Sequence, residues 1–227
     1  MTQTWHDLLF AHWPVDKVLL AQKVPAPLEL ELYNGEAWIA IVPFHMTNVA
    51  PRGVPSLPVM SEFPELNVRT YVRAGSKPGV FFFSLDAGNP LAVTAARTLF
   101  NLPYFTSTMT VEENGGRIRY SSRRVGSTGA NFEAEYQPTG PVFHAQPGSL
   151  EYFLTERYCL YTVADGCASR VDVHHPPWAL QEAEAAIRVN TMTDPIGIRL
   201  PGRTPLLHFS KRQDVVAWLP AGDDSAR

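Results

Sequence analysis

The sequence predicts a mainly β protein of the α+β class, in which an antiparallel sheet closes into a barrel covered by a few short helices. Roughly ten segments show strand patterns, whereas only about two or three short stretches have helical spacing. The 227 residues contain no linker-like stretch, internal repeat or low-complexity tract, which favours a single domain over residues 1–227. A barrel of this size has an interior able to hold a small ligand.

The composition excludes several classes of protein. Hydrophobic residues make up 45% of the chain and charged residues 18%, and the net charge is -3, which gives no electrostatic reason to bind nucleic acid or membranes. No stretch approaches the ~20 apolar residues of a membrane helix, and residues 1–9 lack the pattern of a signal peptide. We expect a soluble protein in the reduced cytoplasm, and whether Cys159 and Cys167 pair across a turn stays open.

The chain is expected to begin with helical structure. Thr4 is a suitable cap for a short helix that runs through His12, and Pro14 would end this helix. Residues 15–20 are expected to add a further helical turn.

Strands are expected to follow. Leucines alternate with glutamates over residues 28–32, and the Asn34-Gly35 pair is a hairpin signal that leads to a strand over 37–42. Three prolines then punctuate a loop that we expect near the mouth of a pocket: Pro51, Pro55 and Pro58.

The middle of the chain predicts two strands and a helix. The strands cover residues 69–72 and 80–85 and are joined by a glycine-bounded turn. Asn89 caps a helix whose first residue is Pro90, and the helix must end before Pro103. The expected apolar face of this helix consists of Leu91, Ala92, Ala95 and Leu99.

The second half of the chain predicts further strands and one short helix over residues 148–155. Strand patterns cover 104–112, 117–123, 131–137, 158–163, 168–174, 206–209 and 215–218. The glycine pair at 115–116 suits a hairpin turn, whereas residues 178–192 fit both a helix and a strand and stay open. Short strands at the chain terminus leave a sheet edge that could support a homo-oligomer.

The most informative stretch is residues 63–71, because strand alternation places Glu65, Asn67, Arg69 and Tyr71 on one side. Such a face is either a solvated surface or the wall of a pocket, and the barrel favours a pocket. A carboxylate, an amide, a guanidinium and a phenol could together orient a ligand that bears a carboxylate or a carbonyl group.

Several segments resemble a YqjF-like bacterial family of unknown function, which is itself similar to the acetoacetate decarboxylase superfamily. These segments span nearly the whole chain: 5–13, 42–44, 64–72, 82–87, 102–104 and 153–158. The resemblance implies a cone-like antiparallel β-barrel with a central pocket, in agreement with the number of predicted strands.

The decarboxylase motif is incomplete in this chain. The resemblance matches Arg97 and Pro103 to the family's motif, whereas Tyr104 and Phe105 stand where decarboxylases carry the two lysines of their Schiff-base chemistry. Tyrosine has no primary amine, so this mechanism is not expected here. The lysines that the chain does have are expected at the surface: Lys17, Lys23, Lys77 and Lys211.

Two functional hypotheses follow. The first is a barrel that binds a small carbonyl- or carboxylate-bearing ligand through Arg97, Arg69 and Glu65 without catalysing a reaction. The second is a lyase-like or isomerase-like enzyme in which Glu65 moves a proton while Tyr104 and Arg97 stabilise negative charge. The resemblance also matches Glu65 to the superfamily's pocket glutamate. A structural interpretation stays open as well, in which Glu65 and Arg69 only pair with each other.

Other chemistry-bearing residues are given structural roles. His174 and His175 are adjacent on a strand and point to opposite faces, so no metal site is expected. Asp86 is expected in a capping network, and Glu156 with Arg157 in an anchoring ion pair. No motif for a nucleophile, a phosphate loop or a cofactor is present in the sequence.

Overall fold

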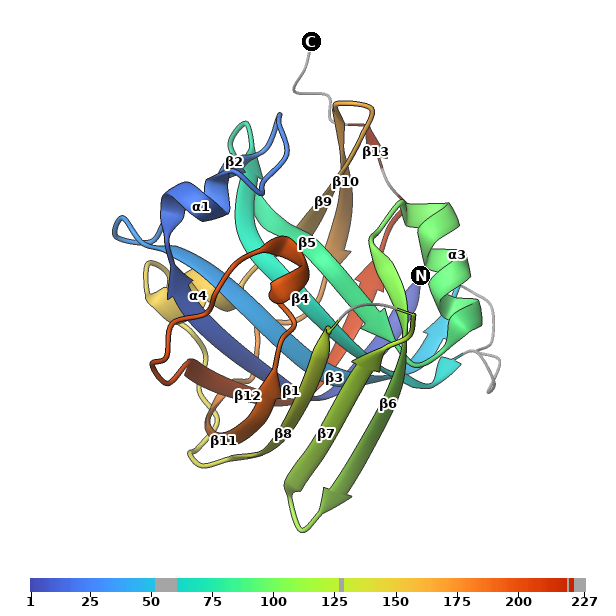
Figure 1. Cartoon of the computed structure of the whole chain (residues 1–227), viewed down its shortest axis with the longest axis vertical. Coiled ribbons are helices and arrows are strands. Elements are labelled where there is room, and N and C mark those ends of the chain that lie inside the picture. Colours follow the sequence, from blue (N-terminus) through green and yellow to red (C-terminus); the bar gives the residue numbers. More distant parts are fainter. Residues whose placement is uncertain (52–60, 127–128, 220, 223–227) are drawn as a thin grey trace.

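Strands make up most of the chain, as the sequence predicts (Figure 1). The computed structural model describes residues 1–51, 61–126, 129–219 and 221–222, so Pro55 and Pro58 of the expected loop lie outside the described residues. The described strands are β1 (Thr2–Val15), β2 (Glu29–Leu30), β3 (Ala37–Ala50), β4 (Phe63–Ala74), β5 (Lys77–Ala87), β6 (Tyr104–Asn114), β7 (Arg117–Arg124), β8 (Asn131–Pro138), β9 (Cys159–Ala164), β10 (Cys167–His174), β11 (Gln181–Asn190), β12 (Leu206–Ala217) and β13 (Ala221–Gly222). The described helices are α1 (Lys17–Ala21), α3 (Pro90–Phe100), α4 (Leu150–Thr155) and a 3-10 turn (Asp194–Ile196).

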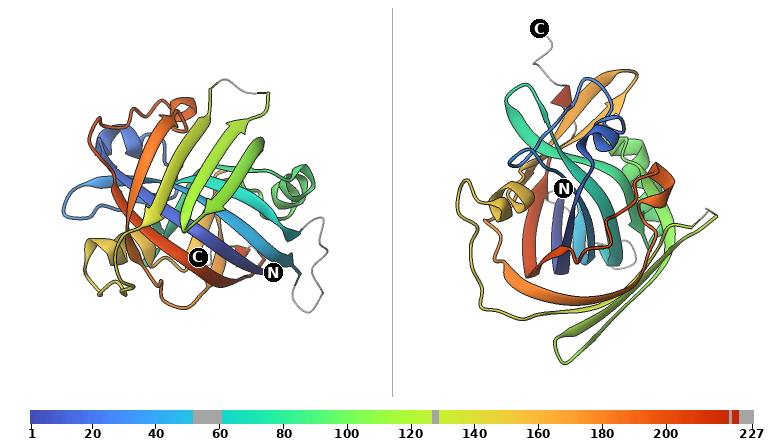
Figure 2. Two further views of the ribbon diagram at one scale, coloured as in Figure 1. Left: turned by 90° about the horizontal axis from the view of Figure 1, so that it is seen from below. Right: turned by 60° about the vertical axis from the view of Figure 1, so that its left-hand side comes forward.

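The strands form a cone-like ring (Figure 2). Their hydrogen-bonded order is β13-β10-β9-β5-β6-β7-β8-β11-β12-β1-β3-β4-β2, and the additional pairs β4–β5 and β10–β12 close the sheet on itself. The predicted fold class, a cone-like and mainly antiparallel sheet, is confirmed, but β5 departs from the antiparallel pattern because it pairs in parallel with both β6 and β9. A parallel neighbour requires a crossover connection, and α3 lies in the one between β5 and β6.

The N-terminal segment is a strand and not the predicted helix. Residues 2–15 form β1, which pairs with β12 on one side and β3 on the other. Residues 8–13 are all buried, and a segment buried on both sides fits a central strand, whereas a surface helix would expose one side. The helical spacing of the apolar residues in this segment was therefore coincidental. The next helical turn was predicted close to its true position, since Asp16 caps α1.

Several local predictions are confirmed. Asn34 and Gly35 both have positive φ, 49° and 82°, as a tight hairpin turn requires, and the Tyr33–Glu36 bridge closes the turn. Beyond this bridge β2 pairs with β4 and not with β3. The side chain of Asn89 accepts hydrogen bonds from the first turn of α3, which ends before Pro103.

Some predictions are wrong in detail, and two points that the sequence left open are now resolved. The two closing strands are one continuous strand, β12. The open segment 178–192 contains strand β11. Of the described side chains of α3, Val93 and Phe100 are the buried apolar ones, whereas Leu91 is exposed; the side chain of Leu99 lies outside the described part. Cys159 and Cys167 are free thiols that lie opposite Asp172 and Ala164 across the β9–β10 hairpin, so they do not face each other.

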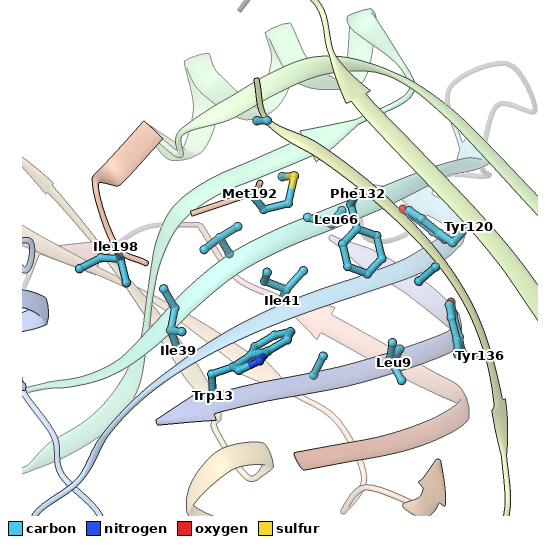
Figure 3. Packing of buried hydrophobic residues seen from close by; sticks show 14 of the residues in the cluster. Leu9, Trp13, Ile39, Ile41, Leu66, Tyr120, Phe132, Tyr136, Met192 and Ile198 are labelled. Atoms are coloured by element: carbon cyan, nitrogen blue, oxygen red, sulfur yellow. The ribbon is translucent and has the colours of Figure 1, made fainter. Parts of the chain in front are cut away.

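Strands β1, β3 and β4 form a wall that has a different core on each side, because successive residues of a strand point to opposite faces. We call one side the Leu66 face: here Leu9, Ile41 and Leu66 pack against Tyr120 of β7 and Phe132 of β8 (Figure 3). Figure 2 shows strands β6, β7 and β8 curving opposite the wall.

The other side of the wall, which we call the Arg69 face, is covered mainly by helices and connecting segments. Phe10 of β1 and Val42 of β3 pack there with Val93 of α3 and Trp178, and Tyr71 of β4 packs with Leu154 of α4 and Phe82. The candidate site lies on this face.

Candidate functional site

The four side chains predicted to share one side of β4 lie together on the Arg69 face, away from solvent. Glu65, Asn67, Arg69 and Tyr71 are 3%, 5%, 8% and 0% exposed. The register shift between β4 and β5 falls where Phe83 is the extra residue on β5, so the alternation of β4 is unbroken. Of the two alternatives, the solvated surface is therefore excluded, and the lining of a pocket stays a prediction.

Glu65 forms a hydrogen-bonded pair with Tyr104, the residue that replaces a decarboxylase lysine. The Tyr104 hydroxyl donates to Glu65 Oε2 at 2.8 Å, and β6 places Tyr104 next to Leu85 of β5. Burial raises the pKa of Glu65 to about 8; the hydrogen bond from Tyr104 opposes this rise, and the charge of Asp86 adds to it. At neutral pH Glu65 is therefore mostly a carboxylic acid, whose own proton is available for donation.

Arg69 is a buried cation that has no anionic partner in the part of the chain that the structure describes. Its Nη2 donates to the Leu154 carbonyl at 3.3 Å, and its guanidinium carbon lies 5.4 Å from the ring centre of Phe10. Among the described residues, no carboxylate lies within 4.0 Å of Arg69, and its Nε has no hydrogen-bond partner. The proposed pairing with Glu65 is not found, since four residues of extended strand separate the two Cα atoms by about 13 Å.

His12 belongs to the same face, although it was not predicted. Its Nε2 lies 2.8 Å from the Tyr71 hydroxyl, which donates to the Leu154 carbonyl at 2.9 Å. Burial, with the nearby Arg69 charge, holds the pKa of His12 well below its ordinary value. His12 was missed because its segment was read as a helix. Alternation of residues 8, 10 and 12 in a strand reading would have placed it on this face.

Arg97 lies beside the site but is exposed. Its Nε donates to the backbone carbonyl of Tyr104 at 2.6 Å, and its guanidinium carbon lies 5.7 Å from the centre of the Phe105 ring. Arg97 therefore holds the backbone that presents Tyr104.

Unpartnered polar atoms are concentrated on the Arg69 face. The register places Ser210 opposite Leu8 and His208 opposite Phe10, on the same side as His12. The buried atoms of this face that lack a partner within the described part of the chain are His12 Nδ1, Trp38 Nε1, Asn67 Oδ1, Arg69 Nε, Trp178 Nε1, His208 Nδ1 and Ser210 Oγ. Buried polar atoms are nearly always hydrogen-bonded in proteins, so this concentration marks a polar site inside the fold.

The other candidate residues have structural partners. Asp86 forms a bidentate ion pair with Arg124 and does not cap α3. Glu156 accepts from the Trp178 backbone at 2.9 Å, and the anchoring partner of Arg157 is Glu31.

The described residues contain no cluster of His, Cys, Asp or Glu able to hold a metal ion. His175 is buried and hydrogen-bonded, whereas its neighbour His174 is exposed. Lys17, Lys23 and Lys211 are exposed, and Lys77 forms an ion pair with Asp172 at 2.7 Å.

A surface cleft of about 490 Å³ lies elsewhere, between α1, the Asn34-Gly35 turn and residues 199–203. None of the side chains that we place on the Arg69 face lines it. No helix within the described ranges has both the length and the apolar character needed to cross a bilayer.

Comparison with solved structures shows the fold. An acetoacetate decarboxylase from Legionella pneumophila superposes with a TM-score of 0.66 at 10% identity, covering 98% of this chain and 88% of that one. The enduracididine biosynthesis enzyme MppR, complexed with the condensation product of pyruvate and imidazole 4-carboxaldehyde, gives a TM-score of 0.63 at 14% identity, covering 96% and 88%. The chain therefore has the acetoacetate decarboxylase-like fold that the sequence resemblance implied.

Comparison of sequences shows the family. The model of the DUF2071 family, described as an uncharacterized conserved protein, matches residues 2–214. The uncharacterized protein YqjF of Bacillus subtilis (strain 168) is 53% identical over 218 residues, which cover 96% of this chain and 90% of YqjF. Both matches extend over nearly the whole chain. This YqjF-like protein with an acetoacetate decarboxylase-like fold therefore belongs to the DUF2071 family.

Proposed function

We propose that the protein binds a small ligand with a carboxylate group, which Arg69 holds against the Arg69 face. The observation that carries this proposal is the buried guanidinium of Arg69, which has no carboxylate partner among the described residues. A buried charge is costly unless it is paired and hydrogen-bonded, so an anionic ligand supplies the counterion that the fold lacks.

The charges near Arg69 favour an anion over a neutral carbonyl compound. With a pKa of about 8 Glu65 is mostly neutral at pH 7, and the lowered pKa of His12 keeps its imidazole neutral. Of these three side chains only Arg69 carries a full charge. The planar guanidinium suits a carboxylate, and its Nε edge is the one without a partner. Asn67 and Tyr71 flank Arg69 on β4 and complete the proposed wall.

The structural relatives support a small-molecule site in this fold. MppR is described in complex with pyruvate, a small carboxylate, at a TM-score of 0.62 and 11% identity. We transfer only the size and charge class of that ligand to this chain. The Schiff-base route of decarboxylases is not part of the proposal, because Tyr104 has no amine.

A thermal-shift screen over keto acids, other small carboxylates, aldehydes and cyclic carbonyl compounds tests the proposal. A ligand at 100 times its Kd stabilises the protein by about 2.7 kcal/mol, which corresponds to an increase in Tm of about 5–10 °C for a chain of this size. The expected increase occurs for the wild-type protein and is lost in Arg69→Met.

Arg73→Met is the matched control, because Arg73 lies on the same strand but is exposed and pairs with Glu29. We expect Arg73→Met to keep the ligand-induced increase in Tm. The proposal fails if no carboxylate stabilises the protein, or if the same carboxylates stabilise Arg69→Met equally.

A second candidate function is favoured by the Glu65–Tyr104 pair. An acid with a pKa of about 8 next to a phenol at 2.8 Å is suited to moving a proton in a lyase-like or isomerase-like reaction. Tyr104 would stabilise developing negative charge, and Arg97 would act indirectly by holding the Tyr104 backbone. Glu65→Gln would then abolish turnover of a bound carboxylate and retain its binding. Unchanged turnover in Glu65→Gln would exclude this enzyme hypothesis.

Three further expectations are part of the proposal. We place the protein in the reduced cytoplasm, which is compatible with two free thiols, Cys159 and Cys167. We also expect one domain over residues 1–227 and a homo-oligomer. Light scattering of the purified chain tests the oligomer, and a single cooperative unfolding transition tests the domain.

A further inference from the structure

The hydrogen-bond chain from Leu154 through Tyr71 to His12 determines which nitrogen of His12 carries its proton. The Tyr71 hydroxyl has one hydrogen, and the Leu154 carbonyl at 2.9 Å can only accept it. The Tyr71 oxygen must therefore accept from His12 Nε2 at 2.8 Å. A hydroxyl that donated to His12 instead would leave two oxygen lone pairs facing each other. His12 is thus protonated on Nε2.

This tautomer leaves His12 Nδ1 as an acceptor. The ring is fully buried, and Nδ1 has no hydrogen-bond partner among the described residues. A second proton on the ring is disfavoured, because burial and the charge of Arg69 lower the pKa of His12. The Arg69 face therefore presents a nitrogen that needs a donor from a bound molecule.

His12 and Arg69 lie on either side of one small residue. The register pairs Ala40 of β3 with His12 of β1 and with Arg69 of β4, so the three side chains form a row on the same face. Neighbouring strands are about 4.8 Å apart, which places the Cα atoms of His12 and Arg69 about 10 Å apart across Ala40. The Tyr71 hydroxyl and the Leu154 carbonyl link His12 Nε2 to Arg69 Nη2, so within the described residues His12 Nδ1 and Arg69 Nε are the atoms of these two side chains that lack a partner. A small molecule that reached both atoms would meet an acceptor at one and a cation at the other.

We propose that the ligand is a hydroxy acid, whose carboxylate binds Arg69 and whose hydroxyl donates to His12 Nδ1. This inference rests on the proposed function and names the ligand class. A keto acid presents a second acceptor to His12 Nδ1, where the two lone pairs repel. An amino acid presents a donor, but its ammonium would lie close to the Arg69 cation, so a neutral hydroxyl is the donor that fits both groups.

Matched hydroxy and keto acids test this inference by titration calorimetry: lactate with pyruvate, 3-hydroxybutyrate with acetoacetate, and malate with oxaloacetate. Sites built to hydrogen-bond a hydroxyl discriminate strongly against analogues that lack it. We expect the hydroxy acid of at least one pair to bind the wild-type protein at least about 10-fold more tightly than the corresponding keto acid.

Tyr71→Phe is the informative variant, because it removes the oxygen that fixes the His12 tautomer and changes no other atom. We expect the preference for the hydroxy acid to fall to within about 3-fold in Tyr71→Phe, as His12 becomes free to protonate Nδ1. His12→Phe should remove the preference entirely. Nitrogen NMR of histidine-labelled wild-type protein should show the Nε2 proton of His12 directly.

The outcomes separate this inference from the function on which it rests. If the keto acids bind as tightly as their hydroxy twins or more tightly, or if His12 carries its proton on Nδ1, the hydroxy-acid assignment is overturned and the carboxylate site stands. If none of the six acids binds, the carboxylate site fails, and the assignment fails with it.

Discussion

Two buried arginines, one for each face of the wall, have opposite surroundings. Arg124 belongs with the Leu66 face, where its Nε and Nη2 donate to the Asp86 carboxylate at 2.8 and 2.7 Å, and Ser107 donates to the same carboxylate. Arg69 is similarly buried, but within the described residues its guanidinium faces one carbonyl, at 3.3 Å, and the rings of Phe10 and Tyr71, with no carboxylate. The two positions bury the same side chain in the same fold, so burial alone does not explain the difference.

The difference distinguishes an arginine that stabilises the fold from one that is available to a ligand. Arg124 and Asp86 satisfy each other and need nothing from outside the fold, as buried ion pairs in a core do. Arg69 shares its face with several unpartnered polar atoms, including His12 Nδ1 and Asn67 Oδ1. We infer that the Leu66 face holds the fold together and that the Arg69 face is prepared for a ligand.

The largest expected effect tests the comparison between the two arginines directly. Arg124→Met leaves the buried Asp86 without its partner and should lower the free energy of unfolding by about 3–5 kcal/mol. Arg69→Met removes a cation that has no carboxylate partner among the described residues and donates one long hydrogen bond, to the Leu154 carbonyl, so the stability of the variant should stay within about 1 kcal/mol of the wild-type protein. Urea unfolding followed by circular dichroism measures both variants.

Equal losses of stability in the two variants would contradict this account, because Arg69 would then be as structural as Arg124. Asp86→Asn serves as a control for the ion pair, since it should destabilise the protein through the same interaction.

The next effect concerns the pH dependence of Glu65. Its pKa is about 8 in the folded protein against an ordinary value of 4.5, so between these values the folded state holds a proton that the unfolded state has lost. Stability should therefore fall as the pH rises through this window, by up to about 1.4 kcal/mol per pH unit. Gln does not titrate, so Glu65→Gln should lack this pH-dependent loss of stability. From pH 6 to pH 8 the free energy of unfolding of the variant should therefore rise by about 2–3 kcal/mol relative to that of the wild-type protein.

Urea titrations of both proteins at half-unit pH steps measure this difference. Parallel stability curves for the wild-type protein and Glu65→Gln would show that Glu65 is ionised well below pH 6. In that case Glu65 would be a carboxylate at neutral pH, and the charged groups near Arg69 would include an anion.

A smaller effect is expected from Tyr104→Phe. The hydrogen bond from Tyr104 lowers the pKa of Glu65, so its removal should move that pKa above about 8 and cost about 1 kcal/mol of stability. Carbon NMR of the labelled Glu65 carboxyl follows the titration. Tyr120→Phe is the control, because the Tyr120 hydroxyl donates to the Glu65 backbone carbonyl and not to its carboxyl group. A downward shift in Tyr104→Phe would refute the pairing.

The smallest effect is expected from Arg97→Ala. Arg97 is exposed and bonds only the backbone carbonyl of Tyr104 among the described residues, so its loss should change stability by less than about 1 kcal/mol. We also expect Arg97→Ala to weaken carboxylate binding less than Arg69→Met does. If calorimetry shows the larger loss for Arg97→Ala, the ligand contacts Arg97 and the site extends towards α3.

The period-two pattern of β4 was strong enough to predict which side chains share a face. Glu65, Asn67 and Arg69 alternate with Leu66 and Val68, and this alternation survives in the fold. Residues 2–15 were misread because their apolar spacing also fits a helix, and this error hid His12. The sequence also pointed to Tyr104 through the missing lysine, although its bond to Glu65 depends on a parallel strand pair formed across α3.

The row of His12, Ala40 and Arg69 could not be predicted from the sequence. It depends on the register of three strands that lie far apart along the chain, and register follows from packing on both faces of the wall. The absence of a Glu65–Arg69 pair follows from the same geometry, since a strand keeps residues four positions apart too distant for an ion pair unless both side chains bend.

A crystal structure of the protein with the carboxylate that stabilises it most tests the central claim directly. We expect the carboxylate oxygens to lie within hydrogen-bond distance of Arg69 Nε, over Ala40, with the Arg124–Asp86 pair unchanged. A carboxylate found instead in the surface cleft beside Lys17, Arg199 and Arg203, with Arg69 untouched, would contradict it.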